Sequence, residues 1–164
     1  MRLIFIALLL ATAAIYLTMV LWSLPLITIE ADGFRPFDLR LFGYSIEEAE
    51  EFNNALSEEG RVFYLDTQHW IDTLFPALLA ASLIWSALFL WQGIARWVVV
   101  GIAVIAAVAD YLENAAVARL LDGFDPAIAA EANKWTLIKS ASVTVVFLAI
   151  LLALALRLGR RIRS

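Results

Sequence analysis

The sequence contains no cysteine and only one histidine, His69. The absence of cysteine excludes disulfide bonds, thiolate metal sites and thiol redox chemistry. A single histidine argues against a haem held by two histidines and against any histidine-rich metal site. A glycine-rich phosphate loop, a nucleophile elbow and a nucleic-acid-binding motif are also absent, so we expect no nucleic-acid partner.

Charged residues are scarce and hydrophobic residues are abundant. Charged residues make up 17% of the 164 residues and hydrophobic residues 63%, whereas a soluble domain is nearer half apolar. The excess apolar surface must therefore face lipid. A bilayer core requires about 20 apolar residues as helix. Four segments meet this length, and we predict spans at residues 3–27, 70–91, 97–118 and 135–156. The expected fold class is an all-α integral membrane protein, a four-helix transmembrane bundle forming one domain over residues 1–164.

The placement of positive charge predicts the orientation of the spans. Arg2, Arg96 and the arginines after residue 156 all fall on one side of a four-span chain, and lysine and arginine favour the cytoplasmic side. The expected location is a bacterial inner (plasma) membrane with both termini cytoplasmic. The extracytoplasmic segment, residues 30–68, then carries ten acidic residues against three arginines.

This outer segment should contain a helical cap between the first two spans. Ser45 followed by Glu48 is a capping box, and apolar residues recur after it at helical spacing. Gly60 suits the stop after a helix, so we predict a helix from Ser45 to about Glu59 and a second helix from Arg61. The cap is either a solvated cover or a lid over a site. In the loop before it, Phe34, Phe37 and Phe42 should anchor the chain to the membrane interface or the bundle top.

The stretch "VADYLENAAVARLL" places polar residues at the end of the third span. Asp110 lies about 20 Å along the predicted helix and Glu113 about 24 Å, which puts both in the outer third of the bilayer. Asp72 on the second span and Lys139 on the fourth fall at the same depth. Three helices thus bring ionisable groups to one level, and Asn114 shares the face of Asp110.

The second span repeats this pattern, because His69, Asp72, Thr73 and Pro76 also follow helical spacing. Charges within a bilayer face the bundle interior and pair there, so we expect one polar pocket open to the outside. Pro76 has no N–H to donate to the carbonyl of Asp72. We therefore predict that this carbonyl accepts from another donor.

Two interpretations of this polar cluster remain open. In the first, Lys139 neutralises a carboxylate and Asn114 completes a clasp between helices. In the second, three acids against one lysine leave a surplus of negative charge that a proton, a cation or a cationic ligand must balance. Arg119 would weaken the second interpretation if it reached back into the cluster.

The pocket interpretation predicts binding of a small amphipathic, lipid-like or cationic ligand. Its candidate ligand-binding residues are Asp72, Asp110, Glu113, Asn114, Lys139 and His69. An alternative is a membrane-embedded enzyme of isomerase or cyclase type, with Asp110 and Glu113 as catalytic acid and base. A less favoured version of this enzyme would use a divalent metal held by Asp72, Asp110, Glu113 and His69. No metal site and no cofactor are assigned. A third alternative is an accessory subunit, with a membrane-protein partner or a second copy, in which the cluster is only a clasp.

Several motifs along the chain support a resemblance. "PFDLRLFGYSIEEA", "GRVFYL", "FPALLAA", "DYLENAAVARLL" and "WTLIKSA" together resemble uncharacterised small bacterial four-span membrane proteins with a D-x-x-E-N motif. The resemblance extends over nearly the whole chain and implies four spans, with no activity to carry over. A looser likeness to four-span sterol-isomerase-type membrane proteins is an analogy of fold alone.

Overall fold

The computed structural model describes residues 1–162, in which all regular structure is helical. Four long helical stretches make up most of it, and each is long and apolar enough to cross a membrane. Two of them contain a short π-helical segment, a feature often found at functional sites. The stretches are α1 (Arg2–Thr18) with η1 (Met19–Ser23) and α2 (Leu24–Glu30); α4 (Glu58–Phe63) with η3 (Tyr64–Gln68) and α5 (His69–Leu90); α6 (Gly93–Asp122); and α7 (Pro126–Ile162).

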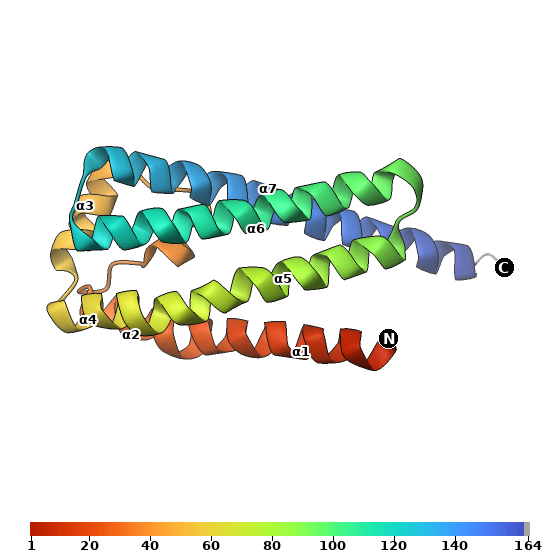
Figure 1. Cartoon of the computed structure of the whole chain (residues 1–164), viewed down its shortest axis with the longest axis horizontal. Coiled ribbons are helices and arrows are strands. Elements are labelled where there is room, and N and C mark those ends of the chain that lie inside the picture. Colours follow the sequence, from red (N-terminus) through yellow and green to blue (C-terminus); the bar gives the residue numbers. More distant parts are fainter. Residues whose placement is uncertain (163–164) are drawn as a thin grey trace.

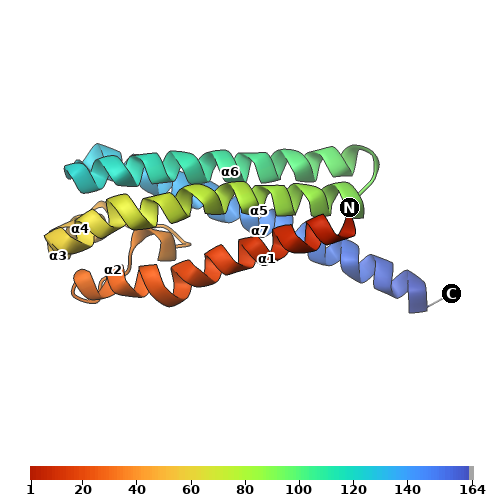
Figure 2. The ribbon, with the colours of Figure 1, turned by 60° about the horizontal axis from the view of Figure 1, so that its bottom comes forward.

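These stretches form an all-α four-span bundle, which confirms the predicted fold class and makes the chain a multi-pass membrane protein. α6 packs most extensively against α7 and then α5, and α1 packs mainly on α5. Figures 1 and 2 show both termini at one end of the bundle, together with the α5–α6 turn. We call this the terminal end, and the opposite end, which carries α3, the cap end.

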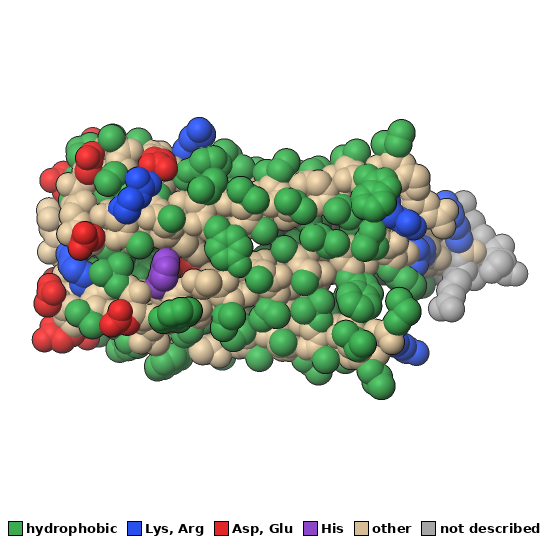
Figure 3. All heavy atoms as spheres, in the orientation of Figure 1, with side chains coloured by type: hydrophobic (Ala, Val, Ile, Leu, Met, Phe, Trp, Pro, Cys, Tyr) green, Lys and Arg blue, Asp and Glu red, His purple; other side chains and the backbone are tan. Residues whose placement is uncertain are grey.

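Charge is distributed along the bundle as a membrane protein requires. Figure 3 shows acidic side chains gathered at the cap end, a broad apolar band over the middle, and lysine and arginine side chains at the terminal end. Most apolar side chains of the spans point outward, since only 11% of the most apolar window of α7 is buried inside the protein. An outward-facing apolar surface of this kind is suited to lipid contact.

The cap begins with a short 3₁₀ turn, η2 (Phe37–Leu39), followed by α3 (Ile46–Ala55). The Ser45 hydroxyl accepts from the Glu48 amide at 3.1 Å, and the Ser45 amide donates to the Glu48 carboxylate at 2.7 Å. The predicted capping box and the helical cap are therefore confirmed. Because the box satisfies two otherwise unpaired amides, it fixes the start of α3.

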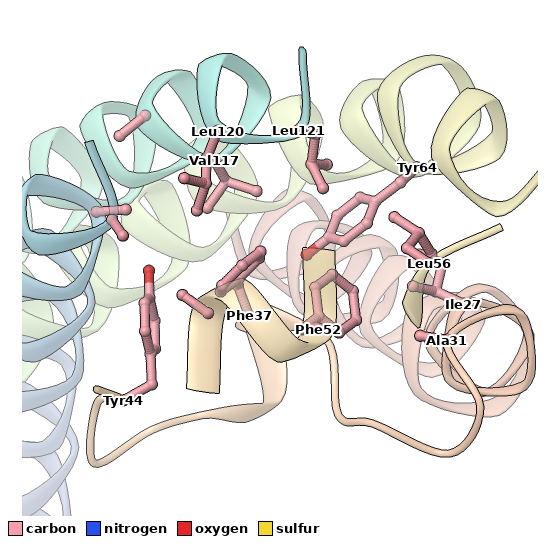
Figure 4. Packing of buried hydrophobic residues seen from close by; sticks show 14 of the residues in the cluster. Ile27, Ala31, Phe37, Tyr44, Phe52, Leu56, Tyr64, Val117, Leu120 and Leu121 are labelled. Atoms are coloured by element: carbon pink, nitrogen blue, oxygen red, sulfur yellow. The ribbon is translucent and has the colours of Figure 1, made fainter. Parts of the chain in front are cut away.

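The cap has its own hydrophobic core, built around Phe37 and Phe52. Figure 4 shows these rings below Tyr64 of η3 and Leu120 and Leu121 of α6, and all five side chains belong to one buried cluster. Both rings are fully buried, and their centroids lie 4.9 Å apart in an edge-to-face arrangement. Of the three expected anchors, Phe37 thus packs into the bundle top. Phe34 and Phe42 are exposed.

The loop between η2 and α3 is tied to α7 at one close contact. The Tyr44 amide donates to Asn133 Oδ1 at 2.9 Å. The preceding residue, Gly43, has φ +82°, and a Cβ there would lie 2.5 Å from the same oxygen. Only glycine fits this position without displacing Asn133, so the contact holds η2 over the bundle.

The predicted boundaries of the cap helices were wrong. α3 ends at Ala55 instead of near Glu59, and α4 begins at Glu58 instead of Arg61. Gly60 does not stop a helix. It lies within α4, buried against α2, where an added Cβ would lie 2.5 Å from the Glu30 Cβ. The glycine is needed for the close approach of two helices, a use that sequence spacing alone cannot distinguish from a helix stop.

The helices also extend beyond the predicted spans. α4, η3 and α5 run continuously, so the helix of the second span begins at Glu58, well before residue 70. The predicted third and fourth spans leave residues 119–134 between them. In the structure only residues 123–125 lie outside the helices, because Pro126 begins α7. Proline is well suited to the first position of a helix.

Candidate functional site

A buried ion-pair cluster lies between α6 and α7 near the cap end. Lys139 of α7 pairs with the Glu113 carboxylate and, at 3.3 Å, with Asp110 Oδ1. All three side chains are largely buried, and Glu113 is only 1% exposed. Thr136, one turn before Lys139, donates to Glu113 Oε1 at 2.5 Å. The acidic stripe of α6 is therefore held by a lysine and a hydroxyl from one face of α7.

Asn114 connects this cluster to α5. Its Nδ2 donates to the backbone carbonyl of Asp72 at 3.2 Å, the carbonyl that Pro76 leaves without its helical donor. The prediction made from Pro76 is thus confirmed. Tyr111 adds a second link to the same turn, because its hydroxyl donates to the Thr73 carbonyl at 2.9 Å.

The Asp72 carboxylate meets a carboxylate from the cap. Asp38 of η2 approaches it closely, and both side chains line the same cavity. The Tyr64 hydroxyl donates to Asp38 Oδ2, and Figure 4 shows Tyr64 pointing inward beside Phe37. Neither carboxylate forms an ion pair with a lysine or arginine of the described residues. Two acids from separate elements are therefore brought together without a direct ion pair, and Lys139 acts on them only from a greater distance.

Gln68 closes this part of the site from the π-helical segment η3. The Ser23 hydroxyl of η1 donates to Gln68 Oε1 at 2.6 Å, so the two π-helical segments lie side by side. Gln68 is fully buried, and its Nε2 has no hydrogen-bond partner among the described residues. Because Oε1 is held by Ser23, only the Nε2 end of the amide is left without a partner, and Gln68 lines the cavity together with Asp72.

Tyr44 reaches the cluster from the cap. Its hydroxyl is buried near Glu113 and Lys139. Burial, with the Glu113 carboxylate nearby, raises the pKa of Tyr44 well above its usual range. The cap thus contributes both Asp38 and Tyr44, and it forms part of the site instead of only covering it.

The cavity between these groups is small, about 10 Å³. A volume of this size holds about one water molecule. Among its lining residues, Asp38, Leu65, His69 and Ala118 remain partly exposed. Leu65 and His69 belong to the second span and Ala118 to α6, so part of the open side lies between these helices. Figure 3 shows the histidine at the surface of this face.

A second cavity of about 10 Å³ lies toward the terminal end. Apart from Asp110 its lining is mainly apolar, with Pro76, Leu83 and Ala103 among the residues. It offers one carboxylate and little else for polar recognition.

The structure brings together five of the six predicted ligand-binding residues. Asp72, Asp110, Glu113, Asn114 and Lys139 all face the bundle interior, while His69 lies at the rim of the cavity. Arg119 does not reach the cluster, because it pairs with Glu131 at 2.7 Å on the surface. Within the described part of the chain, no three histidine, aspartate or glutamate side chains are arranged as metal ligands. The four-ligand metal alternative is therefore not assembled.

Five residues of the site were missed by the sequence analysis: Asp38, Tyr44, Tyr64, Gln68 and Thr136. Thr136 lies three residues before Lys139, and Gln68 four before Asp72, so helical spacing could have identified both. Tyr64 lies four residues before Gln68 in the same continuous helical stretch and carries the same signal. Asp38 and Tyr44 carry no such signal, because a loop brings this part of the cap to the bundle.

Comparison with family models, with curated proteins and with solved structures gives no match to this chain. The functional argument consequently depends on the site itself.

Proposed function

We propose that the protein binds the positively charged head group of an amphipathic ligand in the carboxylate-rich site at the cap end. The observation that carries this proposal is the pairing of Asp38 with Asp72 around a buried cavity, with no lysine or arginine of the described residues paired to either. Two neighbouring carboxylates of this kind favour a cation between them.

The two halves of the polar cluster have different roles. Lys139 and Thr136 engage Asp110 and Glu113, so this half acts as a clasp between α6 and α7. The Asp38–Asp72 half has no such partner and takes the ligand. The polar cluster thus contains both a clasp and a pocket. The carboxylates that bind the ligand belong to α5 and the cap, and those on the acidic face of α6 hold the helices together.

The distribution of charge favours binding at one side of the membrane over transport across it. Between the cluster and the terminal end, the spans contain no acidic or basic side chain until Arg2, Arg96 and Arg157. A relay of protons or ions across the bilayer requires polar groups along its path.

The lateral opening suits an amphipathic ligand. An alkyl chain lying among lipids would pass between Leu65 and Ala118, where the cavity is partly exposed. The cavity holds only about one water-sized group. A larger head group therefore requires η2 to move away from Asp72.

Binding of dodecylamine to the protein in lipid nanodiscs tests the proposal, with laurate as the anionic amphiphile of equal chain length. We expect dodecylamine to bind more tightly, measured by tryptophan fluorescence against empty nanodiscs. Replacing Asp72→Asn should weaken its binding by at least about tenfold, because one neutralised contact changes affinity on that scale. Asp66→Asn is the matched control, since Asp66 is exposed on the neighbouring turn. Equal binding of the two amphiphiles, or equal effects of the two variants, would contradict the proposal.

The charge pattern also supports a location and an orientation. With Arg2, Arg96 and Arg157 at the terminal end, the positive-inside tendency favours cytoplasmic termini in a bacterial inner membrane. The site then opens toward the outer leaflet. Reporter fusions at each terminus that give a cytoplasmic signal are the expected result.

A further inference from the structure

The uncommitted donor of Gln68 indicates a second requirement of the ligand. The other polar groups that line this cavity are largely engaged: Asn114 with the Asp72 carbonyl, Tyr64 with Asp38, and Glu113 with Lys139 and Thr136. Of the side chains that line this cavity, Gln68 is the one with a buried donor, Nε2, that has no partner among the described residues. A buried donor of this kind needs an acceptor.

An ammonium group cannot meet this need. It only donates hydrogen bonds, so it suits Asp38 and Asp72 but leaves Gln68 unpaired. A hydroxyl group both accepts and donates. Placed in the cavity, it accepts from Gln68 Nε2 while its own hydrogen faces a carboxylate.

We infer that the ligand is an amphipathic amino alcohol, whose hydroxyl occupies the cavity beside Gln68 and whose ammonium lies between Asp38 and Asp72. This inference rests on the proposed function and specifies the chemical class of its ligand. The cavity volume of about 10 Å³ matches one hydroxyl-sized group. The ammonium therefore lies where the two carboxylates now meet. To admit it, η2 must move away from Asp72 by about the width of one small group.

Gln68 is well held for this role. Its oxygen is fixed by Ser23 at 2.6 Å, and the side chain is fully buried. A donor that is already oriented loses little freedom when the ligand binds. Gln68 is thus the residue that determines whether the ligand must carry a hydroxyl.

The test compares 2-aminododecan-1-ol with dodecylamine, which have the same twelve-carbon chain and differ in the hydroxyl on C1 and in the amine lying on C2 instead of C1. Wild-type protein in nanodiscs should prefer the amino alcohol by about tenfold, the ratio expected for one buried hydrogen bond. Gln68→Met should reduce this preference to near one, measured as the ratio of the two affinities in the same variant. Gln68→Leu also lacks the donor and adds no charge, and it serves if Gln68→Met does not fold.

The outcomes separate this inference from the proposed function. If neither amine binds, the proposed function fails and the inference fails with it. If both amines bind wild-type protein equally, or if the preference survives in a folded Gln68 variant, only the inference is overturned. Dodecan-1-ol, which has the hydroxyl without the charge, should bind weakly. Binding as tight as that of the amino alcohol would mean that the site recognises the hydroxyl alone.

Discussion

The two ends of the bundle bury different kinds of side chain. At the cap end, Phe37, Phe52 and Ile27 form part of a large buried core beside the carboxylates. At the terminal end, the buried cluster consists of Leu83, Ala87, Val99, Ala103 and Val146. Lipid surrounds the spans, and small residues let membrane helices approach closely without a large core. The cap, which contains the charged segment of the chain, has to bury its own aromatic side chains.

This difference indicates where the chain can tolerate change. The cap end holds buried charges, close helix contacts and aromatic rings together, so a substitution there affects several groups at once. The terminal end has small residues and open space around its glycines. Stability should therefore be much more sensitive to substitution at the cap end.

The largest effect is expected for Lys139→Met. It leaves Asp110 and Glu113 buried without a positive partner, and removal of one member of a buried pair costs about 3–5 kcal/mol. The melting temperature in detergent should fall strongly. Lys134→Met is the control, because Lys134 is exposed, forms no ion pair with the described residues, and has its Nζ 5.1 Å from the centroid of the Trp135 ring. A cation–π contact at an exposed site contributes about 0.5–1 kcal/mol.

The same experiment tests the clasp. Adding Glu113→Gln to Lys139→Met should restore part of the lost stability, since one stranded carboxylate becomes neutral. If Lys139→Met and Lys134→Met melt at the same temperature, the buried clasp does not stabilise the bundle.

An intermediate effect is expected from two matched glycine substitutions. Gly60→Ala places a Cβ 2.5 Å from the Glu30 Cβ and 2.9 Å from Leu56 Cδ1, and overpacking of this kind costs about 1–3 kcal/mol. Gly101→Ala in α6 meets nothing within 4 Å. It should leave stability level or raise it by up to about 1 kcal/mol through helix propensity. Equal melting temperatures for the two variants would mean that the ends do not differ in packing.

The smallest effect is expected for Tyr44→Phe, and it should depend on pH. Burial and the nearby Glu113 raise the pKa of Tyr44 above the value of about 10 expected in the unfolded chain. Below pH 10 both states carry the proton. As the pH rises above 10, the unfolded state loses it first, so the folded state loses stability. Wild-type protein should therefore be destabilised at alkaline pH more than Tyr44→Phe.

Chemical unfolding in detergent from pH 7 to 11 measures this difference. Near neutral pH the two proteins should have similar stability, because the Tyr44 hydroxyl has no hydrogen-bond partner among the described residues. Tyr16→Phe, at a half-exposed ring, controls for the loss of a tyrosine as such. If wild type and Tyr44→Phe lose the same amount of stability above pH 10, Tyr44 is not buried as described.

The sequence was informative where helices position the residues. Helical spacing and depth were enough to place Asp110, Glu113 and Lys139 at one level, and the missing N–H of Pro76 was enough to predict a new donor to the Asp72 carbonyl. Asp38 could not be predicted, because an irregular loop carries it into the bundle and its depth cannot be counted along a helix. The predicted helix stop at Gly60 was wrong, because a glycine is equally suited to ending a helix and to a close contact between two helices.

The paired π-helical segments, joined by Ser23 and Gln68, have a consequence for how the chain tolerates insertions and deletions. A π-helical turn takes in one residue more than an α-helical turn, and each residue rotates the helix by about 100°. Deleting one residue within η1 or η3 can therefore restore an α-helical turn and leave the helix on either side in register, whereas the same deletion elsewhere in α1 or α5 would rotate the rest of the span by about 100°. The two joined segments are thus the places in the first two spans where the loss of one residue should be tolerated best.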